Sequence, residues 1–420
     1  MDEESRELPL GPYRALDLTD EKGFLCGKIL GDLGADVIKI EKPGGEPSRC
    51  LGPFFKDIPD PEKSLYWFAY NSNKRGITLN IEAADGKEIF KKLVKKADFI
   101  IESFPPGYMD KLGLGYSTLS QINPGIIMAS ITHFGQEGPY KDYKGCDIVD
   151  MAMGGYMYLC GDTDRPPVRI GFPQAYLHAA ADAAAGIMIA FHYRQLSAEG
   201  QYIDISIQQS MVRTLYNSRM LWDFNRQFIR RRGRLWERRG PAGPTFRPQT
   251  WPCKDGTVTF FMAVGLAGAT MNRAFTQWMD SEGMADDYLR SIEWEKEDAD
   301  RQTQETIDQI SQRIARFFMT HTAAELYEGA KKWRVMLYPV STIKDIAGNP
   351  QLAAREFWEQ VRHPELKTSI VYPGAFIKSS ETPPRIRRRP PLIGEHNAEI
   401  YSELGISKEK LLILKQGNII

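Results

Sequence analysis

The sequence predicts an α/β fold, in which a large domain holds a parallel sheet and a smaller domain has α+β character. In the first part of the chain, strand-like runs alternate with helical patterns, an order typical of parallel strands joined by helical crossovers. After Ser210 the composition changes, and a hairpin pattern followed by helical segments forms a separate group. The chain has 420 residues, which is enough for two or more such domains.

The first crossover is the clearest part of this pattern. Residues 13–18 (YRALDL) and 36–40 (DVIKI) have the composition of strands, and residues 23–33 have a helical pattern between them. Gly34 separates this helix from the next strand, at the position where a left-handed C-cap is expected. The sequence therefore predicts a strand–helix–strand unit over residues 13–40.

The alternation continues beyond this unit. Residues 86–97 (GKEIFKKLVKKA) have the spacing of an amphipathic helix, and residues 98–103 and 125–132 have the pattern of strands. No GxGxxG follows the first strand, so the fingerprint of a dinucleotide site is missing. Such a sheet can still bind a nucleotide-like ligand at the point where its strand order reverses.

Changes in composition divide the chain into four parts. They are the first part of a large domain over residues 1–225, a basic linker with a Gly/Pro loop over 226–244, a small domain over 245–330, and a return to the large domain with a wrapping C-terminal tail over 331–420. In the small domain, two short strands flank Asp255-Gly256, a pair typical of a hairpin turn.

The linker carries a dense basic cluster, formed by Arg230, Arg231, Arg232, Arg234, Arg238 and Arg239. Arginine binds carboxylates in bidentate geometry, so the cluster could recognise an acidic substrate. A solvated linker or a contact between subunits explains the same residues and is the simpler interpretation. Several aromatic residues nearby could line an acyl pocket or simply pack, namely Tyr216, Trp222, Phe224 and Trp236.

The composition argues against several classes of function. The chain has 54 Lys and Arg and 54 Asp and Glu, a balance that disfavours a general nucleic-acid or membrane-surface role. The 5 cysteines are scattered without a CxxC pair and the 6 histidines form no HExxH-type pair, so we predict free thiols and no metal site. The acidic N-terminus lacks the apolar core of a signal peptide, and a cytoplasmic protein is expected.

One acidic residue, Asp182, lies inside a small and apolar run of the sequence. A carboxylate buried there loses its hydration and needs partners or a chemical use. On a helix, His178 is its only local partner, because no Lys or Arg lies within four residues. Two interpretations stay open: a structural acid, held by His178 or by a distant segment, and a catalytic carboxylate.

Six blocks of sequence, taken together and in order, resemble the class III CoA-transferases, the family that includes formyl-CoA transferase and carnitine CoA-transferase. These blocks are LGADVIKIEKPGG (33–45), NSNKRGITLNI (71–81), ADFIIESFPPGYMDKLGLGY (97–116), SITHFGQEGPY (130–140), GFPQAY to GQYIDIS (171–206) and PPLIGEHNAEIYSELGIS (390–407). The resemblance implies a Rossmann-like large domain built from both chain ends, a small domain between them, and a dimer of interlocked, ring-like subunits. It also implies coenzyme A as a co-substrate, with no permanently bound cofactor.

The family's chemistry implies an aspartate nucleophile at a fixed position. That aspartate attacks an acyl-CoA thioester and forms a mixed anhydride and then an aspartyl-CoA thioester, from which the acceptor acid receives CoA. When the chain is anchored on Gly171, Arg194 and Gly200 without a gap, Tyr176 occupies this position. Asp182 lies six residues further on, about 240° around a helix and roughly 9 Å along it, so it does not simply replace the missing acid.

Two accounts of this departure follow. Either a related partner subunit supplies the nucleophile, which we favour, or the local backbone is shifted and Asp182 reaches the thioester. The glycine-rich loop that closes over the intermediate in relatives reads Gly240-Pro241-Ala242-Gly243-Pro244 in this chain, and its two prolines stiffen it. The resemblance therefore implies a heteromer with a paralogous subunit, and otherwise a self-sufficient homodimer.

The resemblance also carries over positions that contact CoA in the family. They are Lys42, Leu79, Ser103, Phe104, Lys111, Leu112 and Lys144. Adenine favours an apolar wall, and phosphates favour Lys, Arg or backbone N–H groups. Each lysine could instead belong to a solvated face, and Phe104 could be plain core. Glu82 stands where a relative has lysine, which puts one phosphate contact in doubt.

Two related groups of enzymes help to define the expected reaction and substrate. The α-methylacyl-CoA racemases use a histidine in a Gly-His-Asp motif, whereas this chain has Gly145-Cys146-Asp147 and lacks their proton carriers. The chain is more similar to the succinyl-CoA:benzylsuccinate CoA-transferase group of anaerobic aromatic degradation, whose enzymes pair two related subunits. We therefore expect a subunit that moves CoA from a donor such as succinyl-CoA to an aromatic or dicarboxylic acid.

Overall fold

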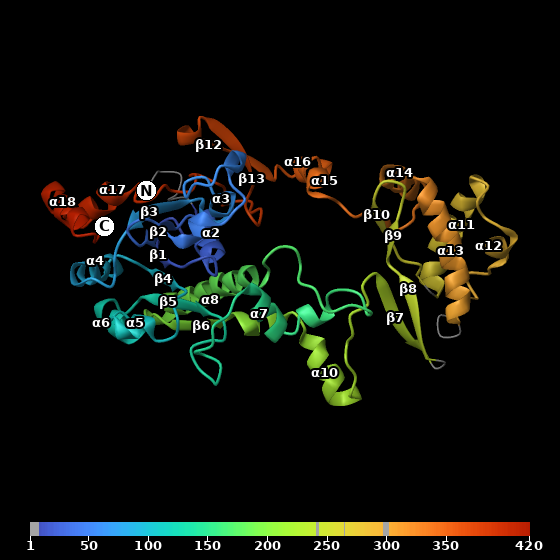
Figure 1. The fold of residues 1–420 in the computed structure, drawn as a ribbon, viewed down its shortest axis with the longest axis horizontal. Helices are drawn as coiled ribbons and strands as arrows, with labels where there is room; N and C mark the ends of the chain where they lie inside the picture. The colour runs from blue at the N-terminus through green and yellow to red at the C-terminus, as the bar shows by residue number, and fades with distance from the viewer. Residues whose placement is uncertain (1–7, 241–242, 264, 297–301) are drawn as a thin grey trace. The chain divides into compact units, whose positions relative to one another are not determined.

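A computed structural model describes residues 8–240, 243–263, 265–296 and 302–420 (Figure 1). The chain forms two compact units. The large unit contains Met1–Met157, Arg169–Phe228 and Gln351–Ile420, and the small unit contains Tyr158–Val168 and Ile229–Pro350. The large unit is therefore built from both ends of the chain.

A six-stranded parallel sheet forms the centre of the large unit, with the strand order β3-β2-β1-β4-β5-β6. Its strands are β1 (Arg14–Leu18), β2 (Asp36–Glu41), β3 (Lys74–Thr78), β4 (Phe99–Glu102), β5 (Ile127–Thr132) and β6 (Tyr202–Ser206). The order reverses between β1 and β4, as in doubly wound sheets, which bind their ligands at that point. The predicted α/β fold with a Rossmann-like parallel sheet is confirmed.

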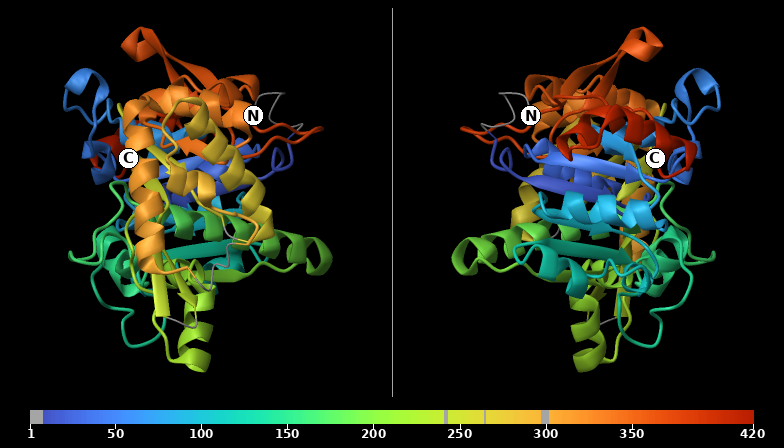
Figure 2. Two further views of the ribbon diagram at one scale, coloured as in Figure 1. Left: turned by 90° about the vertical axis from the view of Figure 1, so that its right-hand side faces the viewer. Right: turned by 90° about the vertical axis from the view of Figure 1, so that its left-hand side faces the viewer.

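Each face of this sheet has its own apolar core, because successive side chains of the buried strands point to opposite faces. On one face, α2 (Phe24–Asp32) and α8 (Ala175–Ser197) pack against the strands, and α8 contributes mainly alanines, which allow a close approach. On the other face lie α4 (Ala84–Val94), α6 (Tyr116–Ile122) and residues of the C-terminal helices. The right-hand view of Figure 2 is turned toward α4 and the C-terminal helices.

The predicted first crossover corresponds closely to the observed one. The helix expected over 23–33 is α2, and the strand expected over 36–40 is β2. Gly34 has a φ of +108°, and a Cβ at this position would lie 2.5 Å from the Cβ of Leu8. Both the turn and the close approach of the N-terminal chain therefore require glycine here.

The large unit contains further short elements around the sheet. They are η1 (Pro47–Cys50), η2 (Phe55–Asp57), α3 (Leu65–Asn71), α5 (Tyr108–Lys111), α7 (Asp147–Met153), α9 (Ile207–Arg213), α10 (Tyr216–Asn225), β12 (Trp358–His363), η4 (Pro364–Leu366), β13 (Thr368–Pro373), α17 (Asn397–Glu403) and α18 (Lys408–Gln416). Two more elements, η3 (Met157–Leu159) and α16 (Pro350–Ala354), lie where the chain passes from one unit to the other. Strands β12 and β13 pair antiparallel as a hairpin.

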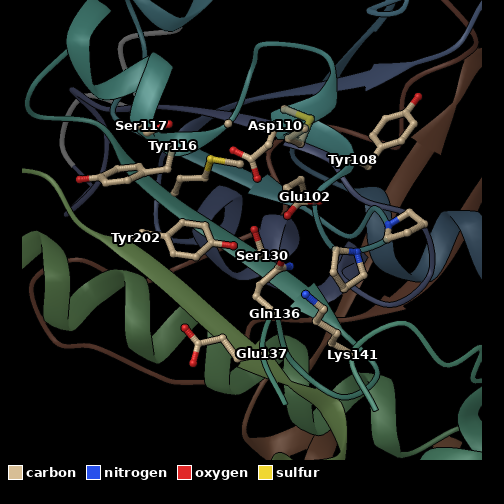
Figure 3. A pocket seen from close by; sticks show the side chains of 16 residues that line it. Glu102, Tyr108, Asp110, Tyr116, Ser117, Ser130, Gln136, Glu137, Lys141 and Tyr202 are labelled. Carbon is tan, nitrogen blue, oxygen red and sulfur yellow. The ribbon is translucent and has the colours of Figure 1, made fainter. Parts of the chain in front are cut away.

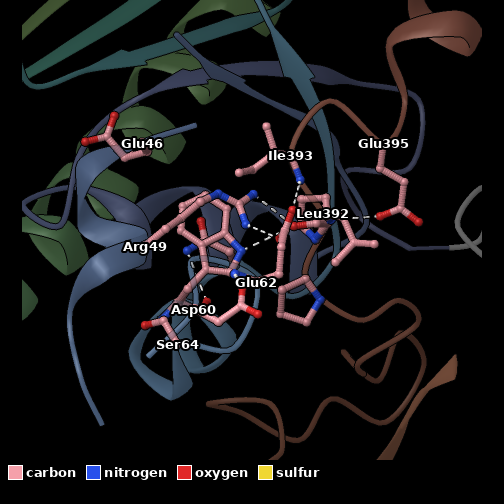
Figure 4. Close-up of polar contacts among 12 residues, drawn as sticks. Glu46, Arg49, Asp60, Glu62, Ser64, Leu392, Ile393 and Glu395 are labelled. Atoms are coloured by element: carbon pink, nitrogen blue, oxygen red, sulfur yellow. Dashed lines mark hydrogen bonds and ion pairs between the residues drawn. The ribbon is translucent and has the colours of Figure 1, made fainter. Parts of the chain in front are cut away.

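A buried arginine ties the C-terminal segment to the N-terminal half (Figure 4). Arg49 Nε lies 2.6 Å from Glu41 Oε2, and its Nη2 lies 2.8 Å from Glu41 Oε1, which is bidentate geometry. Arg49 Nη2 also donates to the carbonyl oxygen of Pro391 at 3.0 Å. Glu62 accepts both Arg49 Nη1 at 2.8 Å and the N–H of Ile393 at 2.9 Å. These contacts fix the returning chain beside β2.

The small unit has a three-stranded antiparallel sheet of order β11-β10-β9. Its strands and helices are β9 (Thr250–Pro252), β10 (Thr257–Phe260), α11 (Leu266–Ser281), α12 (Asp287–Ser291), α13 (Gln304–Thr320), α14 (Ala323–Trp333), β11 (Leu337–Pro339) and α15 (Ile343–Ala347). The antiparallel pairing of β9 with β10 confirms the hairpin predicted around Asp255-Gly256. Packed aromatic rings, including Phe260 and Phe275 with centroids 4.6 Å apart, form its core.

The basic segment in the middle of the chain differs from its expected form. Residues 226–244 were expected to be a linker, but β7 (Leu235–Gly240) pairs antiparallel with β8 (Gly243–Pro248). Glu237 forms ion pairs with Arg232 and Arg239, so part of the charge that suggested a solvated linker is neutralised locally. Pro241 and Ala242, the centre of the expected Gly/Pro loop, lie outside the described residues.

The unit boundaries also differ from the predicted domain boundaries. The small unit runs to Pro350 and includes Tyr158–Val168, whereas the sequence placed the small domain at 245–330 and the return to the large domain at 331. The small unit extends past residue 330 because β11 pairs with β10, and Arg231 donates to carbonyl oxygens of the 158–168 segment.

Candidate functional site

The carboxyl ends of β1 and β4 meet where the strand order reverses. Asp20 follows β1, and Ser103, a predicted CoA-contacting residue, follows β4. The Ser103 hydroxyl accepts the N–H of Asp20 and donates to Asp20 Oδ1, both at 2.9 Å. These two bonds hold the strand ends together, so Ser103 forms part of a fixed edge at the position where doubly wound sheets bind ligands.

Two more predicted CoA-contacting residues, Lys42 and Phe104, belong to one connected group. Lys42 Nζ lies 3.0 Å from Glu82 Oε1 in an exposed ion pair. The Tyr108 hydroxyl donates to the same oxygen at 2.5 Å, and the Tyr108 ring centroid lies 4.7 Å from that of Phe104. The Tyr108 hydrogen bond and Lys42 hold the pKa of Glu82 below its usual value. The ionised Glu82 therefore offsets the charge that Lys42 would present to a phosphate.

The remaining predicted CoA-contacting residues differ in exposure. Lys111, at the end of α5, and Lys144, after β5, are exposed to solvent. Leu112 is half-buried, whereas Leu79 is only 1% exposed and belongs to the core between the sheet and α4. Leu79 therefore offers little surface of its own to a ligand, whereas Phe104 and Leu112 are partly buried residues packed against the same core.

Asp147 fixes the N-terminus of α8 from another part of the chain. Its Oδ1 accepts the backbone N–H groups of Gln174 and Ala175, both at 2.9 Å. Backbone N–H groups at a helix start lack partners within the helix, so this carboxylate satisfies two of them. Cys146, which stands where the racemase motif has histidine, is exposed. Asp147 therefore serves as the cap of α8.

Tyr176 lies in the first turn of α8 and is 8% exposed. Burial, together with the charges of Asp150 and Glu21, raises the pKa of its phenol above the ordinary value. The phenol therefore stays protonated near neutral pH. A protonated phenol cannot form the acyl anhydride that a carboxylate nucleophile forms.

A histidine–carboxylate pair lies next to Tyr176. His133 Nδ1 lies 2.8 Å from Asp150 Oδ2, and the ring centroids of His133 and Tyr176 are 6.2 Å apart. Burial raises the pKa of the Asp150 carboxyl. Neither His133 nor Asp150 is among the residues predicted for the site, because β5 and α7 bring them together only in the fold. A polar residue directly after a buried strand, as His133 is after β5, was the available signal.

Asp182 is held by a distant segment. Its carboxylate pairs with the guanidinium of Arg213 on α9, and the Asp182 side chain is 23% exposed. His178, the local partner considered from the sequence, is not needed to explain its position. Helix α8 runs without a break from Ala175 to Ser197, so in this structure no backbone shift brings Asp182 to the position of Tyr176.

The basic cluster of residues 230–239 has protein partners. Besides the two ion pairs of Glu237, Arg231 Nε donates to the carbonyl oxygen of Asp162 at 2.9 Å, and its Nη2 donates to that of Arg165 at 2.7 Å. These contacts lie within the small unit and favour a structural role for at least Arg231, Arg232 and Arg239.

The described residues also contain no group of three or more His, Cys, Asp or Glu side chains that could hold a metal ion. None of the described helices combines the length and apolar character needed to cross a membrane. All five cysteines, which lie in the described part of the chain, are free thiols, as their scattered spacing predicted.

Comparisons with known proteins agree with the motifs. The model of CoA-transferase family III matches residues 14–397. The chain is 36% identical over 393 residues to succinyl-CoA:(R)-benzylsuccinate CoA-transferase subunit BbsE of Thauera aromatica, covering 94% of this chain and 93% of that protein. It is 31% identical over 420 residues to succinyl-CoA–D-citramalate CoA-transferase of Chloroflexus aurantiacus, covering 98% of each.

A solved structure extends this agreement to the fold. The crystal structure of a CAIB/BAIF family protein from Brucella suis superposes with a TM-score of 0.79 at 28% identity, covering 94% of this chain and 99% of that chain. Sequence motifs, the family match and the fold point to one conclusion: the chain belongs to CoA-transferase family III.

Proposed function

We propose that this chain is one subunit of a heteromeric CoA-transferase, and that a related subunit supplies the reactive carboxylate. The enzyme moves CoA from an acyl-CoA donor, succinyl-CoA, to a free acid of the benzylsuccinate type. The single observation that carries the subunit assignment is Tyr176, a buried and protonated phenol at the start of α8, where the family nucleophile is expected.

The reaction proceeds through a carboxylate of the related subunit. That carboxylate attacks the succinyl-CoA carbonyl, which forms a mixed anhydride and releases CoA thiolate. The thiolate attacks the protein-side carbonyl of the anhydride, so that succinate leaves and an enzyme–CoA thioester remains. The acceptor carboxylate attacks this thioester and again releases thiolate, which attacks the acceptor's carbonyl to give the acceptor–CoA thioester and the free enzyme carboxylate. No water enters these steps, and exclusion of water protects both intermediates.

The CoA-binding part of the proposal rests on the edge of the sheet around β1 and β4. Exposed Lys111 and Lys144 are suited to the phosphates, and Phe104 with Leu112 is suited to the adenine. Lys42 also belongs to this face, although Glu82 partly neutralises it. CoA acts here as a co-substrate, and no permanently bound cofactor is proposed.

The choice of acids rests on similarity. The protein that is 36% identical over 94% of this chain is named as a subunit of succinyl-CoA:(R)-benzylsuccinate CoA-transferase. The relative from Chloroflexus aurantiacus also has succinyl-CoA in its name. These names support a succinyl-CoA donor more directly than they support the aromatic acceptor. We further propose that the subunits interlock as rings and that the enzyme acts in the cytoplasm.

A self-sufficient homodimer is the second candidate. Asp182 is the observation that favours it, because this carboxylate lies on the same helix as Tyr176 among small residues. Its ion pair with Arg213 must break before the carboxylate can attack a thioester, and this cost weakens the candidate.

Hydroxylamine trapping separates the two candidates, because hydroxylamine converts acyl-enzyme intermediates into stable hydroxamates. The chain is incubated with succinyl-CoA and hydroxylamine, alone and in complex with a related subunit, and the hydroxamate is located by peptide mass spectrometry. We expect a hydroxamate only on the related subunit, and a complex carrying Tyr176→Phe that transfers CoA at close to the unmodified rate.

Three results would contradict the subunit proposal. They are thioester exchange by the chain alone at an enzymatic rate, a hydroxamate on Asp182, and loss of transfer in a complex carrying Asp182→Asn that still assembles. Uptake of solvent deuterium at the α-carbon of an acyl-CoA, without CoA transfer, would instead indicate chemistry of the racemase type.

A further inference from the structure

A cavity of about 390 Å³ lies in the large unit beside β4, β5 and β6, closed on one side by α5 and α6 (Figure 3). Its volume is in the range of small-molecule sites. None of the seven residues assigned to CoA contacts lines it, and neither do Tyr176 and Asp182. The proposed function therefore leaves this cavity without a role.

Two buried polar side chains form the inner wall of the cavity. Ser130, on β5, is 1% exposed, and its hydroxyl lies against Glu102 and Tyr202 without a well-aligned hydrogen bond among the described residues. Glu102, on β4, is 3% exposed, and its Oε2 accepts the backbone N–H of Phe104 at 2.7 Å. Figure 3 shows that the side chains of Glu102, Ser130 and Tyr202 point toward one another. A buried hydroxyl whose contacts are poorly aligned is under-satisfied, and a ligand in this cavity would supply a better-aligned partner.

The charged side chains around the cavity favour a ligand with a positive charge. Three carboxylates line it, from Glu102, Asp110 and Glu137, against one ammonium group, from Lys141. An anionic ligand would meet this excess of negative charge near a buried acid, where repulsion is poorly screened. A cation would be attracted by the same groups.

Aromatic rings complete the wall. The ring centroids of Tyr116 and Tyr202 lie 5.7 Å apart at an interplanar angle of 35°. Burial raises the pKa of the Tyr202 phenol to about 12, so this ring stays neutral. Neutral tyrosine faces attract ammonium groups and also pack against the carbon chain that carries them.

We propose that this cavity binds a small organic cation with a primary ammonium group, which donates to Glu102 and Ser130 while its carbon chain packs against Tyr116 and Tyr202. The ammonium supplies the donors that both buried oxygen groups can accept. A neutral alcohol of the same length satisfies Ser130 but gains nothing from the carboxylates. A carboxylate of the same length is repelled.

Binding should also release a proton. Burial raises the pKa of Glu102 to about 7, so this carboxyl is partly protonated in the empty cavity at neutral pH. A bound ammonium favours the ionised form and lowers that pKa. The other ionisable groups around Glu102 and its cavity are Asp20 and Lys22 after β1, Tyr108 and Asp110 on α5, Tyr116 on α6, Glu137 and Lys141 after β5, and Tyr202 on β6. Glu102, with a pKa of about 7, changes its charge near neutral pH, whereas Tyr202, with a pKa of about 12, does not.

The test uses butylammonium as the probe, with 1-butanol and butyrate as neutral and anionic controls of the same chain length. Isothermal titration calorimetry of the full chain, in the assembly in which it purifies, is repeated at pH 7 in buffers of different ionisation enthalpy. We expect one butylammonium per chain, release of a fraction of a proton, and binding at least about tenfold tighter than that of either control. Affinity should rise as the pH increases through 7, because Glu102 becomes ionised without the ligand.

Matched variants assign the effect to the cavity. Glu102→Gln should weaken butylammonium binding by about tenfold and abolish the proton release, and Ser130→Ala should weaken binding with the release retained. Glu88→Gln, on the exposed side of α4, should change neither quantity. If Glu102→Gln does not fold, butylammonium binding by Ser130→Ala and Asp110→Asn is compared with binding by the unmodified chain. The proposal is overturned if butylammonium does not bind, if butanol or butyrate binds as tightly, or if binding and proton release persist in folded Glu102→Gln.

Discussion

At the start of α8, one residue, Tyr176, lies in surroundings that disfavour a reactive carboxylate. Burial and the nearby charges of Asp150 and Glu21 raise the pKa of the Tyr176 phenol, and the same features would raise the pKa of an acid placed there. An acid with a raised pKa would be less ionised and therefore less available as a nucleophile. The surroundings of Tyr176 thus agree with the proposal that another subunit provides this group.

Replacement of a second residue, Glu82, by glutamine should strengthen CoA binding. Its carboxylate neutralises Lys42 at the proposed phosphate-binding face, with Nζ and Oε1 3.0 Å apart. Removal of this negative charge leaves the Lys42 ammonium free to attract a phosphate, so Glu82→Gln should tighten CoA binding severalfold. Fluorescence or calorimetric titration with CoA at low ionic strength measures this change.

The gain from Glu82→Gln should shrink as salt is added, because the ion pair is exposed and screened. Glu88→Gln, which also removes an exposed carboxylate but lies on α4, is the control and should leave CoA binding unchanged. Equal or weaker CoA binding by Glu82→Gln would place the phosphates away from Lys42.

At this scale, the sequence predicted residue types better than residue contacts. The assignment of Tyr176 to the nucleophile position followed from counting residues between motifs, and it stays a prediction. The pairs Asp182–Arg213 and His133–Asp150 were missed because their members lie on different elements and have no local pattern. The seven CoA-contacting positions came from resemblance alone, and they stay predictions.

Among the elements, one buried carboxylate connects the first three strands of the sheet. Asp17 on β1 is fully buried, with its Oδ2 2.8 Å from Lys74 Nζ on β3 and its Oδ1 3.3 Å from Lys39 Nζ on β2. Burial alone would raise the pKa of Asp17, but the charges of Lys39 and Lys74 outweigh it and hold the pKa at about 2. Burial lowers the pKa of Lys74 to about 8.

Removing this carboxylate should be strongly destabilising. Asp17→Asn leaves Lys39 and Lys74 buried without a counter-charge, and breaking a buried pair in this way costs about 3–5 kcal/mol. Urea unfolding followed by circular dichroism should give a midpoint far below that of the unmodified chain. Asp85→Asn, which removes an exposed carboxylate 3.7 Å from Lys410, is the control and should unfold almost as the unmodified chain does. If Asp17→Asn lowers the free energy of unfolding only slightly, Lys39 and Lys74 must become neutral or hydrogen-bond to water in the variant.

The hairpin of β12 and β13 should become less stable in acid. His363 on β12 is buried, its Nδ1 lies 2.8 Å from Glu365, and its Nε2 lies 3.0 Å from the Tyr372 hydroxyl. Burial lowers the pKa of His363 below its unfolded value, Glu365 opposes this effect, and Arg389 adds to it. The unfolded hairpin therefore binds a proton more readily, and stability falls as the pH drops through about 6.5.

Hydrogen exchange of the β12 and β13 amides measures this loss. After correction for intrinsic exchange, protection should be lower at pH 5.5 than at pH 7.5, and the difference should shrink in His363→Gln. The same pH dependence in both proteins would exclude His363 as the cause.

The sequence predicted regular elements well and the paired basic segment poorly. The strand over 36–40 was found because its apolar and β-branched residues lie in a continuous run, as expected for a strand buried on both faces. Residues 226–244 are predicted as a linker because arginine, glycine and proline dominate the composition there, but they contain β7 and the start of β8. Cross-strand pairing and the ion pairs of Glu237 support these strands, and neither is visible in a local pattern.

For the molecule as a whole, an exposed apolar surface on α10 bears on the proposed heteromer. Helix α10 has no buried residue, and several of its large side chains are exposed: Tyr216 by 70%, Met220 by 61% and Phe224 by 85%. Phe228, just beyond the helix, is 57% exposed. Exposed apolar groups of this kind mark surfaces that bind another protein, and the related subunit is the partner that the proposed function requires.

Substitutions on α10 should therefore separate the subunits without unfolding this chain. Burial of a large apolar side chain contributes about 1.5–3 kcal/mol, so Met220→Glu combined with Phe224→Glu should weaken association at least about 100-fold. Size-exclusion chromatography with light scattering on the co-expressed subunits should give separate species, and CoA transfer should be lost in parallel. Leu412→Glu, which places the same charge on the exposed face of α18, should leave both assembly and transfer intact.

Because all of these positions are exposed, the circular dichroism of each variant should stay unchanged. If the α10 variant still assembles and transfers CoA, the related subunit binds elsewhere, and α10 needs a different explanation.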